Sequence, residues 1–258
     1  MSPKPTLIFV PGAWHPASIW DKVSSLLKAQ GYNCIAITLP TTTSDPSKTF
    51  SDDFQAVRNA IKTETAQGRN VVVVVHSYGG AVGVSAVKDL TAAKGNTSTI
   101  TSDPTGHVIG ICSMASGFGP AGKTFMDALG GAPPNSWKLD YESGFAVLVG
   151  DPSESFYHDL PEEERKYWVS KLLDQSLKAL TEGAEDTYAG WMDVPVWYLA
   201  TTEDRALPFQ AQQYFVQTVK DAGGNITVRE VESGHSPMLS KPKETADFIS
   251  EAVTAFVG

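Results

Sequence analysis

The sequence predicts an α/β fold built on a doubly wound, mostly parallel sheet. Short apolar runs rich in β-branched residues alternate along the chain with longer stretches that have helical spacing. Some of the short runs, such as the valines at 71–75, are apolar throughout, which is typical of strands buried on both faces. The chain has 258 residues, of which 41% are hydrophobic and 19% charged, so one large domain is expected.

The elements follow one another in a regular order. The expected strands lie at residues 6–10, 33–38, 71–75, 107–112, 194–200 and 226–231. Helical spacing predicts helices at 19–30, 54–65, 80–93, 210–222 and 244–256. The Thr-, Ser- and Asp-rich stretch 41–51 is expected to be an exposed loop. Because strands and helices alternate, helices are expected to cover both faces of the sheet.

Residues 119–191 interrupt this alternation. They contain a Gly-Gly-Ala-Pro-Pro run at 130–134, several aromatic residues and an acidic helix start at 161–164. We therefore expect a single domain over residues 1–258, with an insertion at about 119–191 that lies over the sheet.

Composition and charge restrict the class of partner. The formal charge is −9 and the sequence has no Lys/Arg cluster, which is unlike a nucleic-acid-binding protein or a protein bound to an anionic membrane. A small-molecule substrate is expected, with the chain acting as a monomer or homodimer. The apolar stretch Leu7 to Val10 is too short for a membrane span or a signal-peptide core, so a cytoplasmic protein is expected. Cys34 and Cys112 lie in apolar runs and are expected to be core residues.

A candidate nucleophile follows the third expected strand. The segment Val75-His76-Ser77-Tyr78-Gly79-Gly80 lies between that strand and a helix, which is the context of a nucleophile elbow. The small residues Gly79 and Gly80 suit the sharp turn, whereas Val75 replaces the first Gly of the G-x-S-x-G pattern. The alternative is that Ser77 caps the helix after a buried strand.

A serine nucleophile requires a base within hydrogen-bond reach. Among five histidines, His235 fits best, since it lies in a loop between the last expected strand and the last helix. The other four are each expected to be structural or exposed: His15, His76, His107 and His158.

The third member of a triad is a carboxylate that orients the imidazole. Asp204 follows the strand at 194–200, and Glu203 is the alternative. The order Ser77, Asp204, His235 is the order found in α/β hydrolases. Such chemistry also requires donors for an oxyanion. We expect these to be the backbone N–H groups of Tyr78 and of Ala13, which follows Gly12 in the loop after the first strand.

On these residues the chain resembles the α/β-hydrolase superfamily, in particular the branch of small esterases and hydroxynitrile lyases that includes methyl-salicylate esterase. The resemblance covers nearly the whole chain. It rests on five segments: Pro11-Gly12-Ala13-Trp14-His15 followed by Trp20, His76-Ser77-Tyr78-Gly79-Gly80, Phe156-Tyr157-His158-Asp159, Asp204, and Gly234-His235-Ser236-Pro237. Pro11 departs from the family pattern, which usually has His before this Gly.

The resemblance implies the α/β-hydrolase fold, a cap formed by the insertion, and hydrolysis of an ester through an acyl-enzyme on Ser77. Lyases of this branch carry Thr where this chain has Gly12 and Lys where it has Ser236. An apolar or aromatic ester or lactone is favoured by the aromatic residues of the cap. The expected substrate-binding residues are Gly12, Trp14, Trp137, Phe145 and Trp168.

Two other functions remain open. The first is a lyase or biosynthetic cyclase that uses the triad as acid and base without an acyl-enzyme. The second is a binding protein on the same fold that lacks activity, although such proteins usually lose a triad residue and this chain has all three. No metal or organic cofactor is expected, because no His/Cys/Asp cluster has ligand spacing and no Gly-rich turn has a dinucleotide or phosphate-loop pattern.

Overall fold

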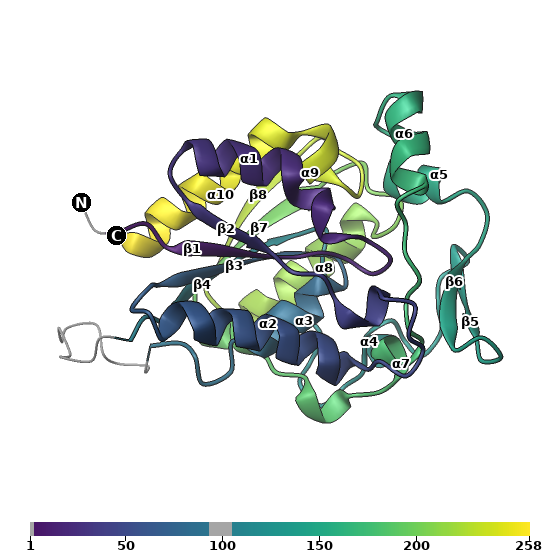
Figure 1. Cartoon of the computed structure of the whole chain (residues 1–258), viewed down its shortest axis with the longest axis horizontal. Helices are drawn as coiled ribbons and strands as arrows, with labels where there is room; N and C mark the ends of the chain where they lie inside the picture. Colours follow the sequence, from purple (N-terminus) through teal and green to yellow (C-terminus); the bar gives the residue numbers. More distant parts are fainter. Residues whose placement is uncertain (1–2, 93–104) are drawn as a thin grey trace.

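A six-stranded, fully parallel sheet forms the centre of the molecule (Figure 1). The computed structural model describes residues 3–92 and 105–258. The order β2-β1-β3-β4-β7-β8 confirms the predicted parallel α/β sheet. The strands are β1 (Thr6–Val10), β2 (Asn33–Ala36), β3 (Val71–His76), β4 (Val108–Met114), β7 (Val196–Thr201) and β8 (Ile226–Val231).

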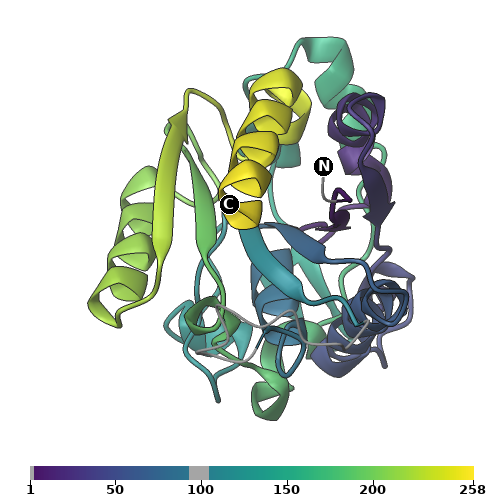
Figure 2. The ribbon, with the colours of Figure 1, turned by 90° about the vertical axis from the view of Figure 1, so that its left-hand side faces the viewer.

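Helices cover both faces of the sheet (Figures 1 and 2). One face carries α1 (Asp21–Ala29) and α10 (Pro242–Val257), with the short α9 (Pro237–Ser240) beside them. The other face carries α2 (Phe50–Thr65), α3 (Gly79–Ala86) and α8 (Phe209–Asp221). The chain runs outward from β1 to β2 and then returns to β3 on the other side of β1. The carboxyl ends of β1 and β3 therefore flank a switch point, where ligands bind in open α/β sheets.

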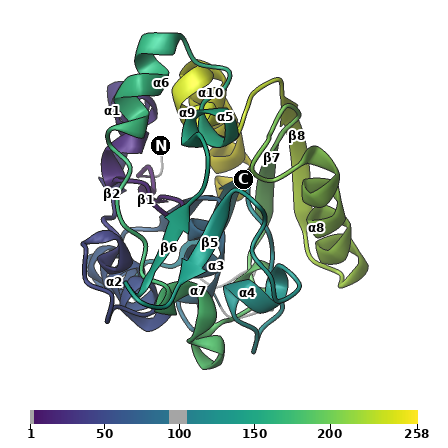
Figure 3. The same cartoon turned by 90° about the vertical axis from the view of Figure 1, so that its right-hand side faces the viewer.

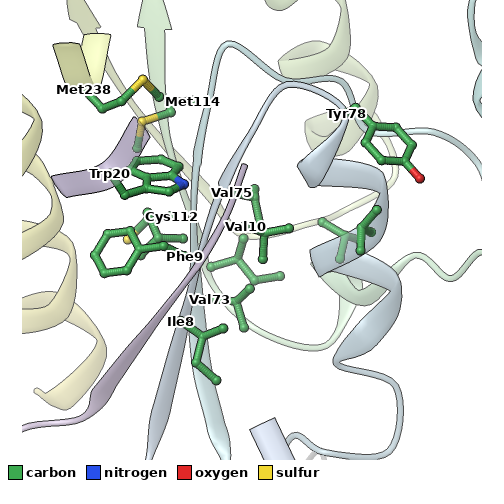
Figure 4. Close-up of a cluster of buried hydrophobic side chains, with 14 of the residues drawn as sticks. Ile8, Phe9, Val10, Trp20, Val73, Val75, Tyr78, Cys112, Met114 and Met238 are labelled. Carbon is green, nitrogen blue, oxygen red and sulfur yellow. The ribbon is translucent and has the colours of Figure 1, made fainter. Parts of the chain in front are cut away.

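Apolar side chains fill both layers between helices and sheet (Figure 4). Phe9 and Trp20 pack on the α10 side, with ring centroids 5.2 Å apart. Val10, Val73 and Val75 point to the opposite side, toward α3. This alternation along continuous apolar strands is why helices are required on both faces.

Residues 119–191 lie over the carboxyl end of the sheet (Figure 3). They form a two-stranded antiparallel hairpin and several short helices. The elements are α4 (Phe125–Ala128), β5 (Trp137–Asp140), β6 (Phe145–Leu148), α5 (Pro152–Phe156), α6 (Glu162–Val169), α7 (Lys178–Thr181) and the 3-10 turns Ala184–Asp186 and Gly190–Met192. The predicted acidic helix start coincides with α6, which carries Glu162, Glu163 and Glu164 in its first turn.

Two local predictions are wrong. The stretch 41–51 is not simply an exposed loop, because Pro40–Thr42 forms a 3-10 turn with Thr41 and Thr42 buried, and α2 already begins at the buried Phe50. The helix expected at 80–93 ends at Ala86, before Asp89 with φ 60°, and its last expected residue lies outside the described residues.

A further 3-10 turn, Ala17–Trp20, precedes α1. Cys112 is buried and Cys34 half-buried, both as free thiols. None of the helices in the described ranges has the length and apolar character needed to cross a membrane.

Candidate active site

Ser77 occupies the turn between β3 and α3 with φ 51°, a conformation that non-glycine residues rarely adopt. Its carbonyl oxygen accepts hydrogen bonds from the hydroxyl of Ser116 at 2.8 Å and from the N–H of Gly80 at 2.9 Å. The helix N-cap is Tyr78, and Ser77 does not cap it. The capping alternative is therefore wrong, and the strained turn has the geometry of a nucleophile elbow.

Glycines let the elbow approach its neighbours closely. A Cβ added at Gly79 would lie 2.3 Å from the carbonyl oxygen of Pro11, and one added at Gly80 would meet the Ser116 hydroxyl at 1.8 Å. Val75 takes the place of a glycine of the motif, yet α3 still packs on β3 because Gly83 faces the Val75 side chain, where a Cβ would lie 2.4 Å from Val75 Cγ1.

Gly79→Ala is expected to lower the free energy of unfolding by about 1–3 kcal/mol, because the new methyl group collides with backbone rather than with a flexible side chain. Gly119→Ala is the matched control, since its Cβ would be in ordinary contact with Ala128, 3.7 Å away. Urea unfolding of both variants measures the difference. Equal stabilities for the two variants would contradict the close packing of the elbow.

His235 and Asp204 form a buried pair at the ends of β8 and β7. His235 Nδ1 lies 2.9 Å from Asp204 Oδ2 and 3.1 Å from Oδ1, so Nδ1 carries a hydrogen and Nε2 is left as the basic nitrogen. The carboxylate also accepts hydrogen bonds from Thr201, Gln212 and the N–H groups of Ala206 and Leu207. These donors satisfy a buried negative charge and fix its position. The alternative carboxylate, Glu203, is exposed.

Two other histidines support the site in their neutral form. His76 Nε2 donates to the carbonyl oxygen of His235 at 2.8 Å, and burial together with the nearby His235 lowers the pKa of His76 well below its usual value. His15 Nδ1 donates to the carbonyl oxygen of Ala13 at 2.6 Å, and burial lowers the pKa of His15 to about 4. Each ring therefore holds the backbone of one loop by a hydrogen bond, His76 the loop after β8 and His15 the loop after β1. The sequence pattern does not reveal this role.

The expected oxyanion donors lie beside Ser77. Ala13, Tyr78, Ser77 and His235 all line one cavity. Within the described residues, the backbone N–H groups of Ala13 and Tyr78 donate no hydrogen bond to protein. Gly12 is in contact with the serine, since a Cβ there would be 3.0 Å from Ser77 Cβ. Two backbone donors without a partner among the described residues, in the same cavity as a serine hydroxyl, form a candidate site for an anionic oxygen.

The rest of the cavity is mostly apolar. Trp14 and Trp137 line it, as expected, and their ring centroids are 5.6 Å apart. Gly12, Phe145 and Trp168, which were also expected to bind the substrate, are not among the residues that line it. Trp14 Nε1 instead donates to the backbone carbonyl oxygen of Ala146, next to Phe145 on β6, and Trp168 of α6 is buried outside the cavity. Further apolar lining comes from residues that the sequence did not single out, among them Phe50, Val84, Phe118, Leu129, Leu207 and Phe215.

The segment Phe156–Asp159 connects residues 119–191 to the loops after β1 and β8. Tyr157 donates its hydroxyl hydrogen to His15 Nε2 at 2.8 Å, and Asp159 Oδ2 accepts from the N–H of Gly234 at 2.7 Å. Phe156 itself lines the cavity, and its ring centroid lies 5.6 Å from that of His235. The segment named in the family resemblance thus contacts the loops after β1 and β8.

A buried carboxylate lies behind Tyr78. Asp53 of α2 is fully buried and accepts hydrogen bonds from Tyr78 Oη at 2.9 Å and from Thr41 Oγ1 at 2.6 Å. Burial raises the pKa of Asp53 to about 6, although its hydrogen bonds from Thr41 and Tyr78 act in the opposite direction. Neighbouring Asp52 is in the opposite situation, because its hydrogen bonds to the N-cap Thr49 lower its pKa.

Asp53→Asn is expected to change the pH dependence of stability. The folded-state pKa lies above the unfolded value of 3.8, so wild-type stability falls as pH rises from about 4 through about 6. The variant lacks this loss, so its stability relative to wild type rises by about 3 kcal/mol between about pH 4 and about pH 7. Urea unfolding over this range measures it. Asp52→Asn should shift in the opposite direction, and parallel curves for Asp53→Asn and wild type would contradict the assignment.

Comparison with known proteins shows the family of this chain. The chain matches the Alpha/beta hydrolase family over residues 7–248. This chain belongs to the alpha/beta hydrolase family. Its fold is the α/β-hydrolase fold, as the sequence resemblance implied. The match covers the loop after β1, the elbow, Asp204 and His235.

Relatives of this chain carry hydrolase, esterase and lyase names. A probable hydrolase of Phoma sp. is 28% identical, with 96% of this chain and 98% of the relative covered. Methylesterase 1 of Arabidopsis thaliana is 24% identical, with 98% of both covered, and an alpha-hydroxynitrile lyase of the same organism is 23% identical over the whole of both chains. The crystal structure of an Arabidopsis methylesterase superposes with a TM-score of 0.73 at 17% identity, covering 97% of this chain and 99% of the other. The predicted esterase and hydroxynitrile lyase branch is confirmed.

Proposed function

We propose that this family member hydrolyses a small apolar or aromatic carboxylic ester or lactone through an acyl-enzyme on Ser77. One observation carries the proposal. Ser77, on a strained turn, shares an apolar cavity with His235, which is bound to Asp204, and with two backbone N–H groups that have no partner among the described residues. These are the groups that acyl transfer requires.

The chemistry follows from these positions. Ser77 Oγ attacks the carbonyl carbon while its proton passes to His235 Nε2, and the oxyanion accepts hydrogen bonds from Ala13 N–H and Tyr78 N–H. His235 then gives the proton to the leaving alkoxide, which departs as the alcohol. Water attacks the acyl-enzyme with His235 as base, releasing the carboxylic acid and restoring Ser77. With a lactone, the alcohol and acid belong to one product.

The residue after the catalytic histidine favours hydrolysis over cyanohydrin cleavage. Ser236 is buried, and its hydroxyl has no partner among the described residues. Hydroxynitrile lyases of the branch that this chain resembles have a Lys at this position. The cation that would stabilise cyanide is therefore absent from position 236. The methylesterase names of two relatives also support ester hydrolysis.

The test is a panel of p-nitrophenyl esters and simple lactones, combined with a serine-reactive phosphonate read by intact mass. Turnover and one-to-one labelling are the expected results. Labelling without turnover of any ester would favour a lyase or cyclase that uses the triad as acid and base. An enzyme that is neither labelled nor active would contradict the proposal and favour a binding protein.

A further inference from the structure

The two loops proposed to bind the oxyanion share an unusual backbone feature. Ser77 has φ 51° and Trp14 has φ 63°, and each lies directly beside a proposed donor, Tyr78 and Ala13 respectively. A non-glycine residue in this region costs of order 1 kcal/mol or more and persists only where its surroundings hold it. What holds each loop therefore bears on how well the donors are positioned.

A continuous chain of buried hydrogen bonds joins the two loops behind the cavity. Tyr78 donates its hydroxyl hydrogen to Asp53 Oδ2 at 2.9 Å, and Thr41 donates to the same carboxylate through Oγ1 at 2.6 Å and N–H at 3.0 Å. Gln175 Nε2 donates to Thr41 Oγ1 at 3.0 Å, and Gln175 Oε1 accepts from Trp14 N–H at 3.3 Å. Thr41, Asp53 and Gln175 are fully buried.

Asp53 lies at the centre of this hydrogen-bond network, and its carboxylate has no counter-ion among the described residues. None of the salt bridges formed by residues 3–92 and 105–258 involves Asp53, so its charge is balanced only by three hydrogen-bond donors. Hydrogen bonds to a charged acceptor are stronger and shorter than neutral ones, so a buried carboxylate orients its donors firmly. Burying the charge of Asp53 has a desolvation cost that an apolar side chain at this position would not have. The presence of a carboxylate here therefore indicates a role in positioning its hydrogen-bond donors.

We propose that Asp53 is a positioning residue for the oxyanion hole, acting on Tyr78 directly and on Trp14 through Thr41 and Gln175. It does not touch the substrate, since Asp53 does not line the cavity. The network acts on the transition state, in which the oxyanion develops, more than on substrate binding. This inference rests on the proposed function.

The network connects residues that lie far apart in the sequence and on different elements of the fold. Asp53 belongs to α2, Tyr78 is the N-cap of α3, and Thr41 belongs to the 3-10 turn Pro40–Thr42. Gln175 lies 161 residues from Trp14 along the chain, within the segment that covers the sheet. The residues over the sheet therefore contribute to the hole as well as to the walls of the cavity.

The test compares Asp53→Asn with Asp52→Asn, which makes the same chemical change one residue earlier on α2. Within the described residues, the Asp52 carboxylate accepts hydrogen bonds only from Thr49 and Lys48, at the start of the helix, so its variant reports damage to α2 alone. We expect Asp53→Asn to lower kcat about tenfold to a hundredfold with KM nearly unchanged. A trifluoromethyl ketone, which forms a tetrahedral adduct with a serine, should lose affinity by the same factor as kcat. Asp52→Asn should keep the wild-type kcat and inhibitor affinity.

The network has two arms, one from Asp53 to Tyr78 and one from Asp53 through Thr41 and Gln175 to Trp14. Two further variants test each arm separately and do not depend on Asp53→Asn folding. Tyr78→Phe removes the hydroxyl and leaves the backbone donor, and Gln175→Met removes the link to Trp14. Each should lower kcat and inhibitor affinity together. Within the Tyr78→Phe background, Asp53→Asn should cost less than in wild type, because one arm is already lost.

Three results would overturn the inference. The first is wild-type kcat and inhibitor affinity in folded Asp53→Asn, or in both arm variants if Asp53→Asn does not fold. The second is a loss confined to KM, and the third is an equal loss in Asp52→Asn. These differ from failure of the proposed function, in which wild type itself neither turns over esters nor reacts with the phosphonate, and the inference would fall with it.

Discussion

Ser77→Ala is expected to reduce ester hydrolysis by about a millionfold, which is the loss found when a triad serine is removed from a serine hydrolase. The reason is that the Ser77 hydroxyl, on the strained turn directly before Tyr78, is the group proposed to form the acyl-enzyme. Residual activity should show no serine labelling. Steady-state kinetics on the best ester of the panel, with phosphonate labelling alongside, measure both effects.

Ser113→Ala is the matched control for this prediction. Ser113 lies on β4, is fully buried, and its hydroxyl has no partner among the described residues. Removing an unpaired buried hydroxyl is nearly neutral for stability, so this variant should fold and keep its activity. If Ser77→Ala retained turnover like that of Ser113→Ala, Ser77 would not be the nucleophile.

Asp204→Asn is expected to lower kcat by about ten thousandfold while the protein stays folded. The Asp204 carboxylate accepts from His235 Nδ1, so it selects the tautomer whose Nε2 can take the serine proton. In the variant, the amide oxygen can still accept from the N–H groups of Ala206 and Leu207. The amide NH₂ then faces the imidazole and favours the wrong tautomer.

Glu203→Gln controls for the loss of a carboxylate in the same loop. Glu203 is exposed and its backbone N–H binds the carbonyl oxygen of Ser233, which the substitution leaves in place. Its kcat should equal that of wild type. Comparable losses in the two variants, or a fully active Asp204→Asn, would remove Asp204 from the triad.

The sequence was most informative where local pattern and function coincide. The strands Thr6–Val10 and Ile226–Val231 have the predicted bounds, because runs of apolar and β-branched residues mark strands directly. The grouping of Ser77, Asp204 and His235 could be anticipated because parallel strands end at one edge of the sheet, and each of the three follows a strand.

The sequence was least informative about contacts between distant segments. Neither Thr41 nor Gln175 carries a motif, and Thr41 was expected to be exposed although it lies fully buried between Asp53 and Gln175. The aromatic residues over the sheet show the same limit. Trp137 and Phe145 begin the two strands of one hairpin, yet only Trp137 lines the cavity, a difference set by tertiary packing rather than by residue type.

Trapping the acyl-enzyme tests the central claim most directly. The wild-type protein is mixed with a p-nitrophenyl ester, quenched in acid within milliseconds to seconds, and examined by intact mass and peptide mapping. We predict one acyl group, on Ser77, that accumulates with a burst of p-nitrophenol and is absent from Ser77→Ala. Steady turnover of the ester with no acyl group on Ser77, or with the acyl group on another residue, would contradict the account.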